Sequence, residues 1–154
     1  MLDALCELSD GRLVDVEVQR ADKGDLQRRA RYYASLVTAD RTRPGTPFGD
    51  VPDVCVVLVC EFDPLRGGRP LYHVDRVVRE TGESADNGLE ELYVNALARD
   101  GGEVSALMRL FVEAEAYDEA RFPETSRVKR RLRETEEGRE DMGSVIEEIR
   151  AECI

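Results

Sequence analysis

The sequence predicts an α+β domain in which a small β-sheet is flanked by helices. Three observations predict it: two strand-like runs at the start, a helical pattern after them, and a nearly unbroken β-branched run, VCVVLVCEF, at residues 54–62. Further helical patterns follow in the last third of the chain. With 154 residues, 42% of them hydrophobic and 36% charged, the chain has the length and composition of one ordinary globular domain.

The first two runs, residues 2–8 and 13–19, are expected to form a hairpin. In the second run every other residue is valine, which is the period-2 pattern of a half-buried strand. A three-residue loop that closes on Gly11 sets Cys6 opposite Val14, so that apolar residues face each other. A two-residue turn would mix the two faces, and we therefore favour the first register.

The favoured register also places Asp3 opposite Glu17, with Gln19 two residues further along that face. Like charges in such a pair repel each other unless a cation lies between them, and Mg²⁺ usually takes one or two carboxylates and keeps several waters. Two interpretations are open at this point: a hard-cation site, or two carboxylates that face solvent. Asp15 lies on the same face and is expected to be a solvated neighbour.

Residues 25–38 are expected to form a helix, because Asp25 is a good N-cap and apolar residues follow at helical spacing. A loop rich in Pro and Gly, residues 41–49, leads to the VCVVLVCEF run. Such a run is typical of a strand covered on both faces. We therefore expect it near the centre of the sheet.

The remaining elements are a strand at residues 71–77, an ambiguous segment in which a strand at 92–95 is favoured, and helices at 103–115, around 127–133 and near 141–153. Glutamates beside the arginines of 127–133 predict a solvated face of paired charges. His73, the only histidine, is expected to be an ordinary surface or partly buried residue and not a catalytic base. Tyr33 is expected in the core.

The formal net charge of −11 argues against a nucleic-acid role, because affinity for phosphates comes chiefly from Lys and Arg. Residues 20–43 are nevertheless net positive, and a local patch of opposite sign can outweigh the whole-chain charge. The four cysteines lack the spacing of a metal site and are expected to be reduced. A cytoplasmic protein is the default expectation, since there is no signal pattern and no apolar run near the ~18 residues that span a bilayer.

An acidic hairpin, a basic helix and a buried strand, in this order, resemble part of the PD-(D/E)XK nuclease core. The run Glu17-Val18-Gln19 after Asp3, the RARYYASL helix and the core strand with its Asp63-Pro64 end together resemble the recombination-promoting nuclease and transposase family of that superfamily. The resemblance covers most of the chain. It implies a restriction-endonuclease-like α+β fold with a small mixed sheet, a nuclease core at residues 1–117 and a helical extension of the same domain at 118–154.

The resemblance further implies a Mg²⁺-dependent DNA endonuclease of the recombination-promoting class, whose biological purpose (recombination, element mobility or defence) stays open. Asp3 and Glu17 would be the metal ligands, together with the carbonyl of Val18. Gln19 stands where many relatives have Lys, and it would orient water through a neutral hydrogen bond. Whether two copies pair to cut both strands is left open. The residues expected to meet the DNA backbone, without reading its bases, are Arg20, Lys23, Arg28, Arg29 and Arg31.

One departure from the family pattern concerns the start of the chain. The family normally has a further helix, and usually another strand, before the strand that carries the Asp, whereas Met1 lies two residues before Asp3. We therefore expect an N-terminally truncated member, either a shortened form that cuts DNA or a remnant that has lost activity. The alternative function is a non-catalytic interaction module that binds itself or a full-length relative.

Overall fold

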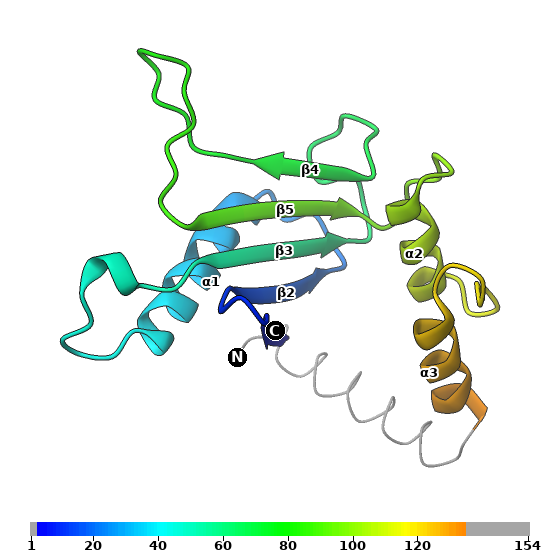
Figure 1. Cartoon of the computed structure of the whole chain (residues 1–154). Helices are drawn as coiled ribbons and strands as arrows, with labels where there is room; N and C mark the ends of the chain where they lie inside the picture. The colour runs from blue at the N-terminus through cyan, green and yellow to red at the C-terminus, as the bar shows by residue number, and fades with distance from the viewer. Residues whose placement is uncertain (1–2, 135–154) are drawn as a thin grey trace. The chain divides into compact units, whose positions relative to one another are not determined.

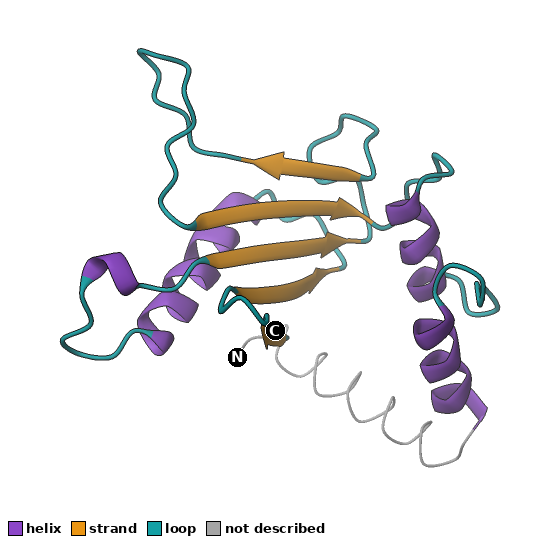
Figure 2. Ribbon diagram, in the orientation of Figure 1, coloured by secondary structure: helices purple, strands orange, loops and turns teal. Residues whose placement is uncertain are grey.

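The computed structural model describes residues 3–134, which contain one five-stranded sheet in the order β1-β2-β3-β5-β4. The β2–β3 and β3–β5 pairs are parallel, and the β1–β2 and β4–β5 pairs are antiparallel. The predicted α+β class and the central place of the VCVVLVCEF strand are therefore confirmed. The elements, shown in Figures 1 and 2, are β1 (Ala4–Glu7), β2 (Leu13–Gln19), α1 (Leu26–Arg41), the 3₁₀ helix η1 (Phe48–Asp50), β3 (Val54–Cys60), β4 (Leu71–Val74), β5 (Leu89–Asn95), α2 (Glu103–Val112) and α3 (Pro123–Glu134).

The β1–β2 hairpin has the predicted register. Cys6 is paired with Val14, and the N–H of Leu8 donates to the carbonyl of Arg12 (2.8 Å) across a three-residue loop. Gly11 closes this loop with φ +87°, a left-handed conformation that glycine adopts without steric cost. The turn thus fixes which side chains of β1 and β2 share a face.

The predicted burial of the hairpin is wrong, because α1 covers the other face. The even-numbered residues were expected to be buried, yet Ala4 and Cys6 are exposed and the side chain of Val18 is 43% exposed. The alternation in β2 predicts the period of the strand, but it does not show which face a helix covers. The neighbouring strand β3 does not show it either, because β3 is apolar on both faces. The buried apolar core on the α1 face consists of Leu13, Leu26, Ala30, Ala34, Val37, Val54, Val56, Leu58, Cys60 and Tyr93.

The other predicted elements exist with shifted ends. The first helix extends three residues beyond its predicted end, β4 ends before residue 77, β5 begins at residue 89, and α2 ends at residue 112. Asp25 precedes α1 but does not cap it through its side chain. Its carboxylate instead forms an ion pair with Arg29 at 2.9 Å. The helix predicted near 141–153 lies outside the described residues.

Several single-residue predictions are also confirmed. Cys6, Cys55 and Cys60 are free thiols, while Cys153 falls outside the described part of the chain. His73 is exposed on β4. Tyr33 is partly buried against the core of the α1 face. Between residues 3 and 134 there is no helix of the length and hydrophobicity that a membrane span requires.

The chain divides into two compact units, Met1–Met108 and Arg109–Ile154. The described part of the second unit includes α3, in which Arg127, Arg130 and Arg133 form ion pairs with glutamates, two of which precede the helix. Arg130 lies 2.6 Å from Glu119, and Arg133 lies 2.9 Å from Glu115. The predicted boundary between residues 117 and 118 stays a prediction.

Lys129 ties α3 to the end of α2. We expect Lys129→Met to lower the free energy of unfolding of this unit by about 2 kcal/mol, because it removes one charged donor from three partly buried backbone carbonyls at once. Urea unfolding measures it, and Arg127→Met, at an exposed arginine paired with Glu124, should cost less than about 0.5 kcal/mol. Equal losses would contradict this role. The ammonium lies 5.0 Å from the centre of the Tyr117 ring and donates to the carbonyls of Leu110 (2.5 Å), Glu113 (2.6 Å) and Ala116 (2.8 Å).

Candidate metal centre

Two carboxylates from neighbouring strands meet at the open end of the β1–β2 hairpin. Continuing the observed register by one residue places Asp3 opposite Glu17. The N–H of Asp3 donates to Oε1 of Glu17 (3.0 Å), and the N–H of Val18 donates to Oδ2 of Asp3 (2.9 Å). Each carboxylate is thus held by a backbone group of the opposite strand. The hairpin alone brings this predicted pair together.

The backbone carbonyls of Val18 and Gln19 point to opposite sides of β2. The N–H and carbonyl of a strand residue point to the same side of the strand. Since the N–H of Val18 is bonded to Asp3, the Val18 carbonyl also points toward β1. The carbonyl of Gln19 points the other way, toward β3, where it accepts from the N–H of Glu61 (2.9 Å). The partly buried Gln19 side chain shares the face of Glu17 by strand alternation.

Neither carboxylate of β2 faces solvent. Asp15 is 0% exposed and Glu17 is 2% exposed, because α1 packs over this face of the strand. Asp15, expected to be a solvated neighbour, has no hydrogen-bond partner for either carboxylate oxygen within the described part of the chain. Burying a carboxylate without a partner is costly. This face therefore contains negative charge that the packing alone does not compensate.

Burial shifts the titration of both carboxylates upward. It raises the pKa of Glu17 to about 7, an effect reinforced by the charges of Asp3 and Asp15 and opposed by the Asp3 N–H and the Tyr33 hydroxyl. It raises the pKa of Asp15 to about 6, reinforced by the charge of Asp3 and opposed by an interaction with Glu17. At neutral pH Glu17 is thus close to half protonated, and Asp15 titrates just below this pH. A bound cation would favour the ionised form of both carboxylates.

The donor set fits a hard divalent cation. Carboxylate and carbonyl oxygens are the ligands of Mg²⁺, which commonly takes one or two carboxylates and keeps several waters. Asp3 and Glu17 supply two carboxylates, and the carbonyl of Val18 faces the same side. Among residues 3–134 no group of three or more His, Cys, Asp or Glu side chains is arranged to hold a metal ion. The protein would therefore supply few ligands and leave the remaining positions to water or substrate.

Comparison with known proteins identifies the family of the chain. A model of the PD-(D/E)XK nuclease family transposases matches residues 1–98. The chain belongs to this family. The match includes all five strands and α1, and the mixed sheet with its helices agrees with a restriction-endonuclease-like PD-(D/E)XK fold. No curated protein and no solved structure matches the chain.

PD-(D/E)XK nucleases generally use divalent metal ions, and membership of a nuclease family suggests DNA as the substrate. The basic residues that we expected to contact DNA follow the carboxylate strand. Lys23, Arg28 and Arg31 are exposed. Arg20 lies 3.8 Å from Glu61, and Arg29 is held by its ion pair on α1. The basic segment is therefore partly open to solvent and partly paired.

Tyr33 also belongs to this site, although its position in the sequence predicted only that it lies in the core. Its hydroxyl lowers the pKa of Glu17, and the pKa of Tyr33 is itself raised by burial and by Glu17 and lowered by Arg29. The spacing of four residues predicts that Arg29 and Tyr33 share a face of α1, but it does not predict that this face covers Glu17. In this PD-(D/E)XK family member, α1 thus places a hydroxyl that favours the ionised form of the buried carboxylate.

Proposed function

We propose that the protein is a Mg²⁺-dependent DNA endonuclease of the recombination-promoting type, which hydrolyses phosphodiester bonds at the Asp3–Glu17 pair. The observation that carries this proposal is the pair of hydrogen bonds by which the N–H of Asp3 holds the Glu17 carboxylate and the N–H of Val18 holds the Asp3 carboxylate. The buried and unpartnered carboxylate of Asp15 supports it, since a cation nearby would offset its charge. Family membership supports the reaction class.

Each group has a defined role in this proposal. Asp3, Glu17 and the carbonyl of Val18 would hold Mg²⁺, which when bound polarises a phosphoryl oxygen and lowers the pKa of a water. Glu17 must be ionised to bind a cation, so loading the site below pH 7 releases a proton. Gln19 donates a neutral hydrogen bond that orients water but adds no positive charge.

The basic segment would bind the DNA backbone. Contacts to phosphates position a duplex without reading its sequence. Lys23, Arg28 and Arg31 are exposed and can meet phosphates directly. Arg20 and Arg29 would exchange their carboxylate partners for phosphates, at little cost because surface ion pairs are weak. Low sequence specificity follows from this mode of binding.

A plasmid-nicking assay with Mg²⁺ tests the proposal. We expect the wild-type protein to nick and Asp3→Asn to be at least about 100-fold slower, because the substitution removes one charged ligand. Glu7→Gln is the matched control, since Glu7 is an exposed carboxylate on the same face of β1. EDTA should abolish nicking. Equal nicking by the wild type and Asp3→Asn would show that the site lies elsewhere.

A non-catalytic interaction module is the second candidate, favoured by exposed apolar side chains on the hairpin face turned away from α1. Leu8 is 39% exposed there, and Val18 is similarly exposed. Such side chains could contact a second copy or a full-length relative. A wild-type protein that neither nicks DNA nor binds Mg²⁺, but associates in sedimentation or pull-down experiments, would favour this candidate.

A further inference from the structure

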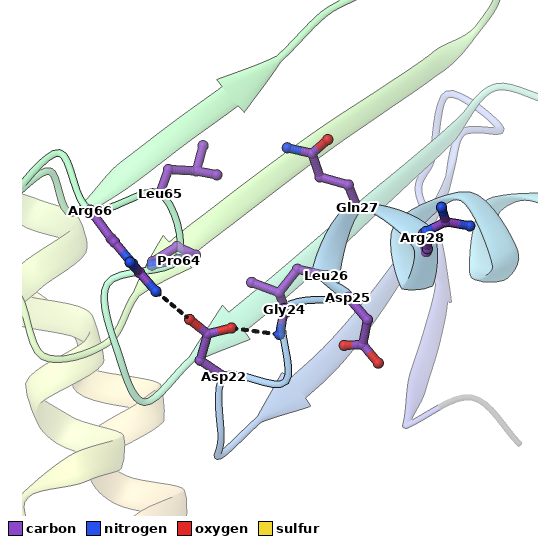
Figure 3. A pocket seen from close by; sticks show the side chains of 9 residues that line it. All are labelled: Asp22, Gly24, Asp25, Leu26, Gln27, Arg28, Pro64, Leu65 and Arg66. Carbon is purple, nitrogen blue, oxygen red and sulfur yellow. Dashed lines mark hydrogen bonds and ion pairs between the residues drawn. The ribbon is translucent and has the colours of Figure 1, made fainter.

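The connection between β3 and β4, residues 61–70, lies beside the start of α1. The two segments line a pocket of about 430 Å³, seen in Figure 3, with Asp22 and Arg28 on one side and Pro64, Leu65 and Arg66 on the other. Both segments begin at the same end of the sheet, because Gln19 is paired with the last residue of β3. The pocket therefore lies at the end of β2 that carries the carboxylate site.

This connection is held in shape by a hydrogen-bond network. The Tyr72 hydroxyl donates to Oδ1 of Asp63 (2.6 Å) and accepts from the N–H groups of Gly67 (2.8 Å) and Arg69 (3.1 Å). The other oxygen of Asp63 accepts from the N–H of Gly68 (2.7 Å). A loop fixed in this way loses little entropy when it binds a ligand.

Arg66 has an unusual backbone conformation in this loop. With φ +56° it is the only non-glycine residue of the described chain with a positive φ. Such a conformation costs free energy for an L-residue, and the cost persists where surrounding structure enforces it, often at functional sites. Glycines follow at the next two positions, yet this position carries an arginine. The strain thus accompanies a guanidinium group held at the pocket.

The guanidinium of Arg66 is available to a ligand. Its side chain is 85% exposed, and its ion pair with Asp22 has a distance of 3.5 Å. In Figure 3 Arg66 extends toward Asp22 across the mouth of the pocket, while Arg28 lies further along α1. An exposed pair of this kind contributes little. A phosphate, which matches the fork of a guanidinium, could replace the carboxylate.

We propose that Arg66 is a positioning residue that binds a phosphate of the DNA backbone and continues the basic surface of α1 onto the β3–β4 connection. This inference rests on the proposed nuclease function and deepens it. The side chain lies at the end of the sheet where Gln19 ends β2, so a duplex bound there is held beside the carboxylate pair. The rigid loop sets the position of that phosphate relative to the metal ligands.

Binding of a labelled 20-bp DNA duplex, measured by fluorescence anisotropy with Ca²⁺ in place of Mg²⁺, tests this role. We expect Arg66→Gly to weaken binding about 10-fold and to reduce the salt dependence by about one phosphate contact. Arg66→Asn, which also tolerates a positive φ, should behave alike. The thermal unfolding midpoint should change little in either variant, because both residues accept the left-handed backbone.

The matched control is Arg79→Gly. Arg79 is exposed on the connection between β4 and β5, at the opposite end of the sheet (Figure 1). Its loss removes the same charge and should leave binding unchanged. Tyr72→Phe, which removes the hydroxyl that fixes the loop, should weaken binding in the wild type but not in the Arg66→Gly background.

The outcomes separate this inference from the proposed function. If the wild type binds the duplex and the Arg66 variants bind equally well, Arg66 has no such role and the nuclease proposal is untouched. Equal weakening by Arg66→Gly and Arg79→Gly also overturns the role, because it would reflect net charge alone. A wild type that does not bind the duplex overturns the proposed function and this inference with it.

Discussion

Glu17→Gln is expected to abolish cleavage and, at the same time, to stabilise the metal-free protein at pH 8. Glu17 is almost completely buried and its pKa is raised to about 7, so at pH 8 it carries a charge that its surroundings disfavour. Glutamine has nearly the same shape and no charge. It cannot replace a carboxylate ligand, and we expect nicking to fall at least about 10³-fold, equivalent to ~4 kcal/mol.

Plasmid nicking and thermal unfolding measure the two effects on the same preparations. The stabilisation should be present at pH 8 and disappear at pH 5, where Glu17 is already protonated in the folded state. Glu7→Gln, at an exposed position of the same hairpin, should change neither property. A destabilised Glu17→Gln protein, or one that still nicks, would contradict the assigned role of this carboxylate.

The metal-free protein should lose stability as the pH rises from about 4 to about 7. Asp15 and Glu17 have pKa values of about 6 and about 7 in the folded state, above their ordinary values of 3.8 and 4.5. Between these limits the folded state binds more protons than the unfolded state, so raising the pH favours unfolding. Each pKa unit corresponds to ~1.4 kcal/mol, and the combined loss therefore amounts to several kcal/mol.

Urea unfolding across this pH range, with chelator or with millimolar Mg²⁺, measures the effect. Mg²⁺ should flatten the dependence, because a cation that binds the ionised site stabilises the folded state. The double variant Asp15→Asn, Glu17→Gln should lack the dependence even with chelator. Stability that rises steadily from pH 4 to pH 7 in the wild type would show that these carboxylates are not held as described.

Much of the sheet could be predicted from the sequence, because its signals are local. The alternation in β2 and the glycine at position 11 determine the register, and the apolar run of β3 indicates a central strand. The buried face could not be predicted in the same way. Carboxylates are ordinarily exposed, and Asp15 and Glu17 are buried because α1 packs over them. Such exceptions are expected at functional sites.

One part of the candidate site could be predicted from the sequence, and another part could not. The proximity of Asp3 to Glu17 follows from the hairpin register alone. The contribution of Tyr33 depends on how α1 packs on the sheet, which no local pattern gives. The left-handed conformation of Arg66 was equally hidden, because arginine is not a residue that a sequence pattern places at a positive φ.

A divalent cation at the Asp3–Glu17 pair is tested most directly by NMR with Mn²⁺, which accepts the same oxygen ligands as Mg²⁺. Substoichiometric Mn²⁺ should broaden the amide signals of Val18 and Gln19 first and leave the signal of Arg79 sharp, and excess Mg²⁺ should restore the lost signals. Glu17→Gln should remove the selective broadening. Broadening that spares Val18 and Gln19, or that is unchanged in Glu17→Gln, would contradict a metal site at these two strands.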